Sequence, residues 1–428
     1  MNEPAFDLRD KSARKLSTSP CISSEKRLKR TELRAIIGEE TVRLCLATCG
    51  QGLRAIVLTG SLARDEATFV EEDSGWQLLG DADFFLVYEQ TSRLPSDGDL
   101  VSLISAIEDS LFARGIYGQI GLGAVQPTYL RHLKPRIATY ELRTCGRVLW
   151  GDGRILSLIP SFSVGEISRE DAWRMLCNRT IEFLGHAAES PLGEAESSSS
   201  FRYAAIKLIL DAATSYLVFA GAYEPGFRRR AVRLCELARE SAAIPPAPFS
   251  LKQFADQVSA CTAWKISDSE KGCDLRPAVW KEAVRHACAL WRWELVQLTG
   301  APASLSDDAL WTRWVSRLTA PQTARGWLSL ARRRGWSKSW RRWPRWVGLS
   351  RRGTPRYAMY RVAVGLLSRL SDSAEMDGTP FRLGSNWGEL RALLPERAPA
   401  SVGLEDSWQK LAADLSWNYK SFLLGTDA

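Results

Sequence analysis

Apolar and polar positions change period repeatedly along the first third of the chain. Residues 24–49 place apolar side chains at helical spacing and end in a Gly-Gln-Gly turn, which predicts a helix. An apolar strand at Ala55–Leu58 follows. Two short runs, Phe69–Glu72 and Trp76–Leu79, flank Asp73-Ser74-Gly75 and predict a β-hairpin.

One helix and several strands complete this region. The helix is expected at Leu100–Arg114, and the strands at Phe84–Tyr88, Tyr117–Val125, Ile137–Leu142 and Arg147–Trp150. The mixture of helices and strands predicts an α+β or α/β fold, a small mixed sheet with helices, ending near residue 155.

No convincing strand pattern follows residue 168, so the remainder is expected to be mostly α-helical. Helices are expected at 168–188, 202–220, 227–241, 279–298, 358–370 and 404–423. Ser190–Ser200 is serine-rich and predicts a flexible connection. The expected domains are a basic tail at 1–23, an α/β domain at 24–155, a helical domain at 168–300 and a helical C-terminal region at 301–428.

Composition excludes several classes of function. Nine cysteines without a CxxC pair favour a reducing cytosol over a disulfide framework. Three distant histidines, His132, His186 and His286, offer little for a histidine-based zinc site or a Ser-His-Asp triad. The polar N-terminus has no secretory signal pattern, and the apolar run 201–223 carries charged residues. We therefore expect a cytoplasmic protein.

Positive charge is concentrated in residues 309–371, which contain fifteen Lys/Arg and no Asp/Glu. A total of +8 with +15 in this segment leaves −7 for the remainder. The segment is therefore where a partner of this positive charge should be sought.

Within this basic segment, residues 331–352 allow three interpretations. Trp336, Trp340 and Trp343 share one helical face, with Lys338, Arg341 and Arg345 roughly opposite and Pro344 expected to break the helix. Such a helix suits an anionic membrane surface, which would make the protein peripheral at the inner membrane. It equally suits a nucleic acid, with arginines on phosphates and indoles on bases. The third interpretation is that the indoles fill the protein's own core.

Residues 53–89 carry the clearest candidate chemistry. Gly60-Ser61 follows the first apolar strand, where a glycine lets a triphosphate approach the backbone and Ser61 with the next amides binds phosphate oxygens. Asp81 and Asp83 begin the strand at Phe84, and strand alternation puts both on one face. Two such carboxylates suit Mg²⁺, which prefers carboxylate and phosphate oxygens.

This stretch resembles the polymerase-β-like nucleotidyltransferase superfamily. The likeness lies in a strand, Gly60-Ser61 in GSLARDEAT at a helix start, and Asp81-Ala82-Asp83 on the next strand, and it covers about residues 24–155. It implies that Mg²⁺, held by Asp81 and Asp83, assists transfer of a nucleoside monophosphate from an NTP such as ATP to an acceptor hydroxyl, releasing pyrophosphate. The acceptor stays open between antibiotic, sugar phosphate, protein side chain and RNA end.

The chain departs from the superfamily pattern in two ways. Nineteen residues separate Ser61 from Asp81, an excess that the predicted hairpin accommodates. The superfamily's third carboxylate is missing from Tyr117–Val125, and Glu141 is the nearest substitute. Glu141 is either the general base for the acceptor proton or a surface partner of a nearby arginine, Arg143 or Arg147.

Two cations are candidates for nucleotide binding. Arg64 lies one turn beyond Ser61 on a helix that we expect to continue, where it contacts a phosphate or pairs with Glu66 or Glu71. Lys207 interrupts an apolar helix in the helical domain, which is expected to complete the active-site cleft. Related transferases place such a lysine over the phosphates, and the alternative for Lys207 is a pair with Asp211.

The resulting expectation is an enzyme, a metal-dependent nucleotidyltransferase. The absent third acid leaves a second hypothesis open, a nucleotide-binding or scaffolding protein of the same fold without catalysis. A third hypothesis is a membrane-surface or nucleic-acid-binding protein that acts through 331–352.

Overall fold

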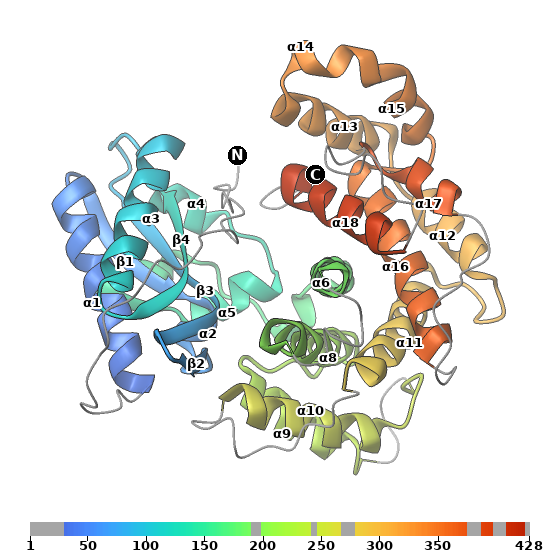
Figure 1. Cartoon of the computed structure of the whole chain (residues 1–428), viewed down its shortest axis with the longest axis horizontal. Coiled ribbons are helices and arrows are strands. Elements are labelled where there is room, and N and C mark those ends of the chain that lie inside the picture. The colour runs from blue at the N-terminus through green and yellow to red at the C-terminus, as the bar shows by residue number, and fades with distance from the viewer. Residues whose placement is uncertain are drawn as a thin grey trace. The chain divides into compact units, whose positions relative to one another are not determined.

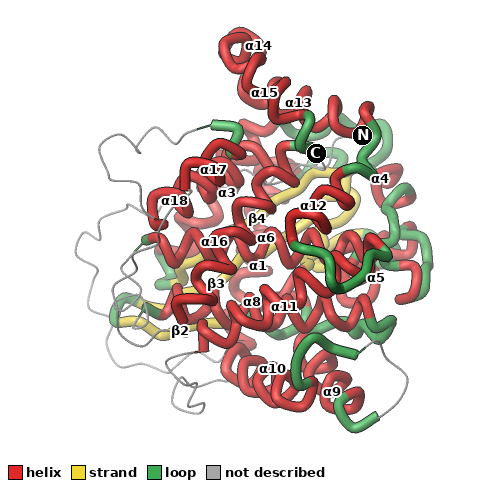
Figure 2. Tube along the Cα trace, turned by 90° about the vertical axis from the view of Figure 1, so that its right-hand side faces the viewer, coloured by secondary structure: helices red, strands yellow, loops and turns green. Residues whose placement is uncertain are grey.

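The computed structural model describes residues 30–189, 198–240, 246–266, 279–374, 387–396 and 408–423. Helices make up most of this chain, with one small sheet near the N-terminus (Figure 2). The expected tail at 1–23 and most of the expected Ser190–Ser200 connection lie outside the described residues. The last two serines of that tract instead begin a helix at Ser199.

The chain divides into two compact units. The N-terminal unit extends to Ile167 and also contains Pro225–Arg229 and the short stretch from Ala263. The helical unit contains the rest of the described chain after Ser168 and draws on both expected helical regions.

The N-terminal unit is built on a five-stranded sheet (Figure 1). Its strands are β1 (Leu53–Thr59), β2 (Thr68–Glu72), β3 (Gly75–Tyr88), β4 (Ile116–Val125) and β5 (Arg147–Gly151). The order is β2-β3-β1-β5, all antiparallel, and β4 pairs with β3 in parallel. The mixed sheet agrees with the expectation from sequence.

The long strand β3 changes partner halfway along one edge. Its first residues pair with β2 up to Thr68↔Leu79, and its later residues pair with β1 from Thr59↔Asp83. Between these pairings Gly80 has φ +112°, a left-handed conformation that favours glycine. Neither β1 nor β2 pairs with β3 between Leu79 and Asp83. The candidate site, which includes Asp81 and Asp83, lies at this interruption of the pairing.

Helices cover both faces of this sheet. Helices α1 (Arg30–Cys49) and α3 (Asp97–Phe112) pack on the face that carries Phe84 and Leu86. Helices α4 (Pro127–Arg131) and α5 (Ile137–Cys145), with the 3₁₀ turns η1 (Ile155–Leu158) and η2 (Val164–Glu166), complete the unit. Leu130, Leu142 and Ile155 pack against Val57 and Val87 on the opposite face.

Most predicted elements of this unit are confirmed, with two corrections. Ile137–Leu142 was expected to be a strand, and that expectation is wrong, because the segment forms helix α5. Packing of Leu142 against the sheet decides between strand and helix for such a short apolar run. The helix that contains Ser61, α2 (Gly60–Ala63), is short and does not continue through Arg64 as expected.

The helical unit contains a bundle in which α6, α8, α11, α16 and α18 are neighbours (Figure 1). Its core includes Trp173, which contacts the rings of Trp311, Trp314, Tyr357 and Tyr360. No helix in the described ranges is both long and apolar enough to cross a bilayer. The elements after residue 168 are α6 (Arg169–Ala188), α8 (Ser199–Phe219), α9 (Phe227–Leu237), α10 (Leu251–Ile266), α11 (Val279–Thr299), α12 (Asp307–Val315), α13 (Ala320–Arg334), α14 (Trp336–Ser339), η4 (Trp340–Arg342), α15 (Trp343–Ser350), α16 (Pro355–Ala374), α17 (Trp387–Leu393), α18 (Trp408–Asn418) and the π-helical η6 (Tyr419–Leu423).

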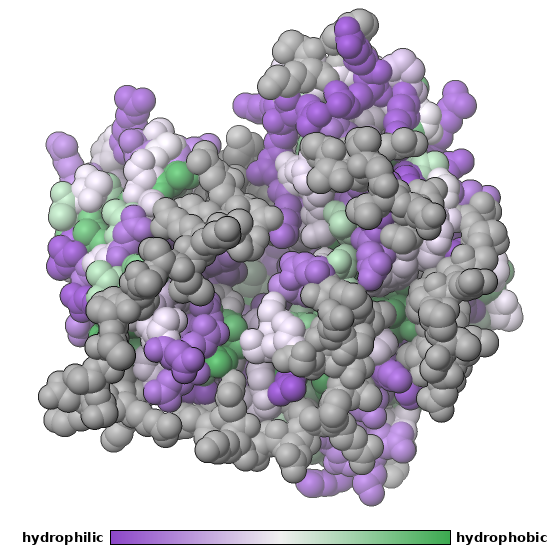
Figure 3. Space-filling model, in the orientation of Figure 1, coloured by the Kyte–Doolittle hydropathy of each residue, from purple (hydrophilic) through white to green (hydrophobic). Residues whose placement is uncertain are grey.

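Residues 331–352 do not form the single tryptophan-faced helix that their spacing suggests. They contain the end of α13 followed by α14, η4 and α15, and Pro344 lies in the first turn of α15, where proline is tolerated. Trp346 is 1% exposed and packs against Trp327, whereas Trp336 is 55% exposed and stacks on Trp343. The side chains of Lys338 and Trp340 lie outside the described part. Hydrophilic residues gather over α13 and α15 (Figure 3).

Candidate active site

The end of β1 brings Gly60-Ser61 beside Asp83. Thr59, the last residue of β1, pairs directly with Asp83 of β3. Gly60 has φ +70°, and a Cβ added there would lie 3.2 Å from Oδ2 of Asp83. A side chain at this position would therefore be strained and would crowd the carboxylate, so glycine keeps the corner open. The two motifs that the sequence suggested are adjacent.

Asp81 and Asp83 share one face of β3, as strand alternation requires. Ala82 between them is fully buried toward α1 and α3, while Asp81 is exposed and Asp83 is partly buried. The aspartates thus belong to the face on which Phe85 and Val87 pack, which is the face that α5 covers. Two solvent-accessible carboxylates and a glycine turn meet at this edge.

Arg64 connects this corner to helix α5. Its guanidinium donates to Glu141 Oε2 at 2.6 Å and to Glu66 Oε2 at 3.2 Å, and its side chain is 9% exposed. Of the alternatives from sequence, the pairing with Glu66 is present, together with a pairing to Glu141 that the sequence did not indicate. A buried, charge-assisted pair of this kind fixes both side chains.

Glu141 is therefore held by Arg64 and not by the two arginines that were its alternative partners. Arg143 donates to the carbonyl of Ile159, and Arg147 pairs with Asp65 at 2.5 Å. Helix α5 places Glu141 on the side of the sheet that Asp81 and Asp83 face. Within the described ranges, no group of three or more His, Cys, Asp or Glu is arranged to hold a metal ion.

The short turn after α2 is fixed from two sides. Asp65 has φ +59°, a left-handed conformation that aspartate tolerates better than most residues. Arg34 donates to its carbonyl oxygen at 3.0 Å, and both Arg34 and Arg147 pair with its carboxylate. These contacts hold the turn that carries Arg64 and Glu66.

A second set of contacts at this site was not predicted from sequence. The carboxylate of Glu66, 4% exposed, accepts hydrogen bonds from the amides of Phe227 (2.9 Å) and Arg228 (3.1 Å), and so caps the start of α9. Two cations lie over the Phe227 ring, Arg64 at 5.6 Å and Lys265 at 5.2 Å from its centroid. Lys265, 1% exposed, also donates to the Thr68 hydroxyl at 3.2 Å.

Lys207 belongs to α8 in the helical unit. Its ammonium lies 5.6 Å from the centroid of Tyr203, and the carboxylate of Asp211 binds Arg179 at 2.5 Å. Burial works to raise the pKa of Asp211, but the charges of Arg179 and Lys207 outweigh it and lower that pKa. The proposed position of Lys207 over nucleotide phosphates stays a prediction.

Comparison with known proteins adds no relative. No protein-family model matches this chain, and no curated protein matches it significantly.

Proposed function

We propose that the N-terminal unit is a metal-dependent nucleotidyltransferase that transfers a nucleoside monophosphate from an NTP to an acceptor hydroxyl and releases pyrophosphate. One observation carries the proposal: Thr59 pairs with Asp83, so a glycine-serine turn adjoins two aspartates on one strand face. A turn that accepts phosphate next to carboxylates that accept a divalent cation suits a triphosphate with its metal.

The donor set at this corner fits Mg²⁺. Asp81 and Asp83 provide hard carboxylate oxygens, and the missing Cβ of Gly60 leaves space beside Asp83. Mg²⁺, when bound, would neutralise phosphate charge and increase the electrophilicity of the α-phosphorus. Membership of the nucleotidyltransferase superfamily and the choice of Mg²⁺ as cofactor are both part of this proposal.

The chain's own groups take the remaining roles. Ser61 is partly exposed, and its hydroxyl and amide are the candidate phosphate donors. Because α2 has only four residues, these individual donors matter more than a helix dipole. Arg64 orients Glu141, the candidate acceptor of the hydroxyl proton, and Lys207 remains a candidate phosphate ligand from the helical unit.

Product formation tests the proposal. The full chain is incubated with Mg²⁺ and each α-labelled NTP in a cell extract, and pyrophosphate release and label transfer are measured. The expected result is label on an acceptor with wild type and none with Asp81→Asn/Asp83→Asn. The matched control is Asp73→Asn, which changes an exposed aspartate in the nearby hairpin turn. Transfer that persists in the double variant contradicts the proposal.

A second candidate function is nucleotide binding without catalysis. It is favoured by the absence of an acid on β4 and by the engagement of Glu141 with Arg64. In that case wild type binds NTP with Mg²⁺ but releases no pyrophosphate, and Glu141→Gln changes nothing. If the protein is instead a nucleotidyltransferase, Glu141→Gln should slow transfer by about 100-fold, because a general base typically contributes at least this factor. Nucleotide binding should be retained.

A third candidate function is binding to an anionic membrane surface or a nucleic acid through residues 331–352. The observation in its favour is that Trp336 and Arg341, five residues apart in the sequence, are both exposed. Deleting the segment would remove buried Trp346 from the core, so Trp336→Ser/Arg341→Glu is the sharper variant. Loss of binding to anionic vesicles or to single-stranded RNA, with unchanged nucleotide binding, identifies the partner. Val232→Ser, at an exposed apolar residue of α9, is the control.

A further inference from the structure

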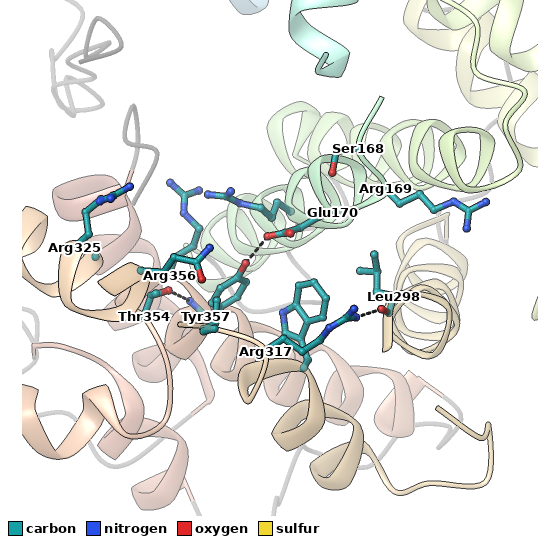
Figure 4. A pocket seen from close by; sticks show the side chains of 14 residues that line it. Ser168, Arg169, Glu170, Leu298, Arg317, Arg325, Thr354, Arg356 and Tyr357 are labelled. Atoms are coloured by element: carbon teal, nitrogen blue, oxygen red, sulfur yellow. Dashed lines mark hydrogen bonds between the residues drawn. The ribbon is translucent and has the colours of Figure 1, made fainter. Parts of the chain in front are cut away.

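The helical unit contains a cavity of about 640 Å³ with a strongly basic wall (Figure 4). Glu170 is the single acidic residue of its lining, against five arginines. The formal charge of the lining, five positive minus one negative, is therefore +4. The arginines are Arg169, Arg174, Arg317, Arg325 and Arg356.

The amino ends of three helices meet at this cavity. Ser168 and Arg169 begin α6, Gln322 lies in the first turn of α13, and Thr354 precedes α16. All three helices have fifteen residues or more. The amide of Gln322 donates to the Thr319 hydroxyl and the amide of Tyr357 donates to the Thr354 hydroxyl, so these two helix starts are already capped. The dipoles of the three helices still add to the positive potential of the arginines.

The acidic residue of the wall is already engaged. Glu170 accepts a hydrogen bond from the Tyr357 hydroxyl at 2.6 Å. In the view of Figure 4, Arg325 and Arg356 lie on one side of this pair, and Arg169 and Arg317 lie on the other. The basic side chains thus flank a carboxylate that already accepts a hydrogen bond, and the positive charges around it outnumber its single negative charge.

Two arginines and a tryptophan of the cavity wall are buried or partly buried. Arg356 is 6% exposed. Burial works to lower the pKa of the Arg174 guanidinium, but its interactions with Tyr360, Tyr357 and Glu170 outweigh burial and raise that pKa. Trp314 is 6% exposed, and its indole Nε1–H has no hydrogen-bond partner among the described residues. A buried donor without a partner is unfavourable, and an oxygen atom of a bound ligand could accept this hydrogen bond.

We infer that this cavity binds a small ligand that carries two or more phosphate groups. Phosphate oxygens match the fork-shaped donors of arginine and the amides of helix starts. The volume lies within the range of small-molecule sites, about 300–1,000 Å³, and the Trp314 and Tyr357 rings give the ligand's organic part an apolar contact. A free nucleotide and an inorganic polyphosphate both have this chemistry. The inference is independent of the proposed transfer reaction.

Titration calorimetry of the full chain with inorganic tripolyphosphate tests this inference. EDTA is present throughout, so that metal-dependent nucleotide binding does not contribute. Arg325→Glu is the main variant because Arg325 is exposed on α13 and its replacement leaves the core intact. Arg332→Glu is the matched control: it makes the same charge change at an exposed residue of the same helix, outside the cavity lining.

The expected result is tripolyphosphate binding that Arg325→Glu weakens about tenfold or more and Arg332→Glu weakens less than about twofold. Trp314→Phe, which removes only the indole donor, is expected to weaken binding about threefold or more. ATP in the same buffer then distinguishes a nucleotide ligand from bare polyphosphate by its additional affinity.

Three results would overturn the inference. The first is no tripolyphosphate binding by wild type. The second is an equal loss in Arg325→Glu and Arg332→Glu, which would show general attraction to the basic segment. The third is selective loss of single-stranded RNA binding in Arg325→Glu without tripolyphosphate binding, which would assign the cavity to nucleic acid.

Discussion

The N-terminal unit gathers two carboxylates beside a glycine turn, whereas the helical unit gathers five arginines around a cavity at which three helices begin. Both regions suit phosphate, but they do so with opposite charge. The acidic corner repels a bare polyphosphate and needs a divalent cation between acid and ligand. The basic cavity is proposed to need none. We therefore expect metal dependence to separate the two regions.

Chelation of divalent cations is expected to give the largest difference between them. With EDTA, nucleotidyl transfer should fall by at least about 1,000-fold, because the phosphates and the two aspartates then repel each other. Tripolyphosphate binding by the cavity should change less than twofold. Pyrophosphate release and calorimetry on the same sample measure both. Equal sensitivity of the two activities to EDTA would remove the distinction.

Two buried glutamates, one in each unit, also differ in pKa. Glu294 on α11 is fully buried, and burial raises its pKa to about 8, with the Ser215 hydroxyl offsetting part of the effect. Glu40 on α1 is 2% exposed, yet its pKa is lowered to about 2, chiefly by the hydrogen bond from Arg43 and further by Ser110 and Arg114, against the effect of burial. Opposite pH dependences of stability follow.

Glu294→Gln should stabilise the protein at high pH. A carboxyl whose folded pKa is raised binds more protons in the folded state, so its contribution falls as pH rises from about 4.5 to about 8. The amide does not ionise, and at pH 9 the variant should exceed wild type by several kcal/mol, with the difference shrinking toward pH 5. Thermal melts from pH 5 to 9 measure this. Parallel curves for the two proteins would contradict the assignment of Glu294.

Glu40→Gln should have a smaller effect with the opposite dependence. A carboxyl whose folded pKa is lowered stabilises the protein above about pH 4.5, and this contribution is lost as pH falls toward about 2. At pH 7 the variant should lose about 1–3 kcal/mol of unfolding free energy, because Arg43 and Arg114 lose their charged acceptor. Glu39→Gln, at an exposed neighbour, is the control. A loss of equal size at pH 7 and pH 3 would argue against ionisation as the cause.

Much of the N-terminal unit was predictable from sequence because its signals are local. The Asp73-Ser74-Gly75 turn defines the hairpin, and alternation around Ala82 defines the shared face of Asp81 and Asp83. Helix α5 was not predictable, since its short apolar run fits strand and helix alike and only packing against the sheet decides.

The parts of the site that depend on distant contacts were beyond a reading of sequence. Glu66 caps α9 across 161 residues, and Lys265 reaches Thr68 across 197. The basic cavity draws its arginines from α6, α13, α16 and the turn after α12, so no spacing marks it. The only available signal was the charge excess of 309–371, which contains Arg317, Arg325 and Arg356. That signal located the charge but not the cavity.

Titration calorimetry of ATP and the other NTPs into the full chain, with and without Mg²⁺, tests whether Asp81 and Asp83 bind the metal of a nucleotide. We expect at least one NTP to bind with a strong dependence on Mg²⁺. We also expect Asp81→Asn/Asp83→Asn to abolish that dependence while tripolyphosphate binding in EDTA is unchanged. Mg²⁺-dependent NTP binding that survives the double variant would contradict the assignment of these aspartates.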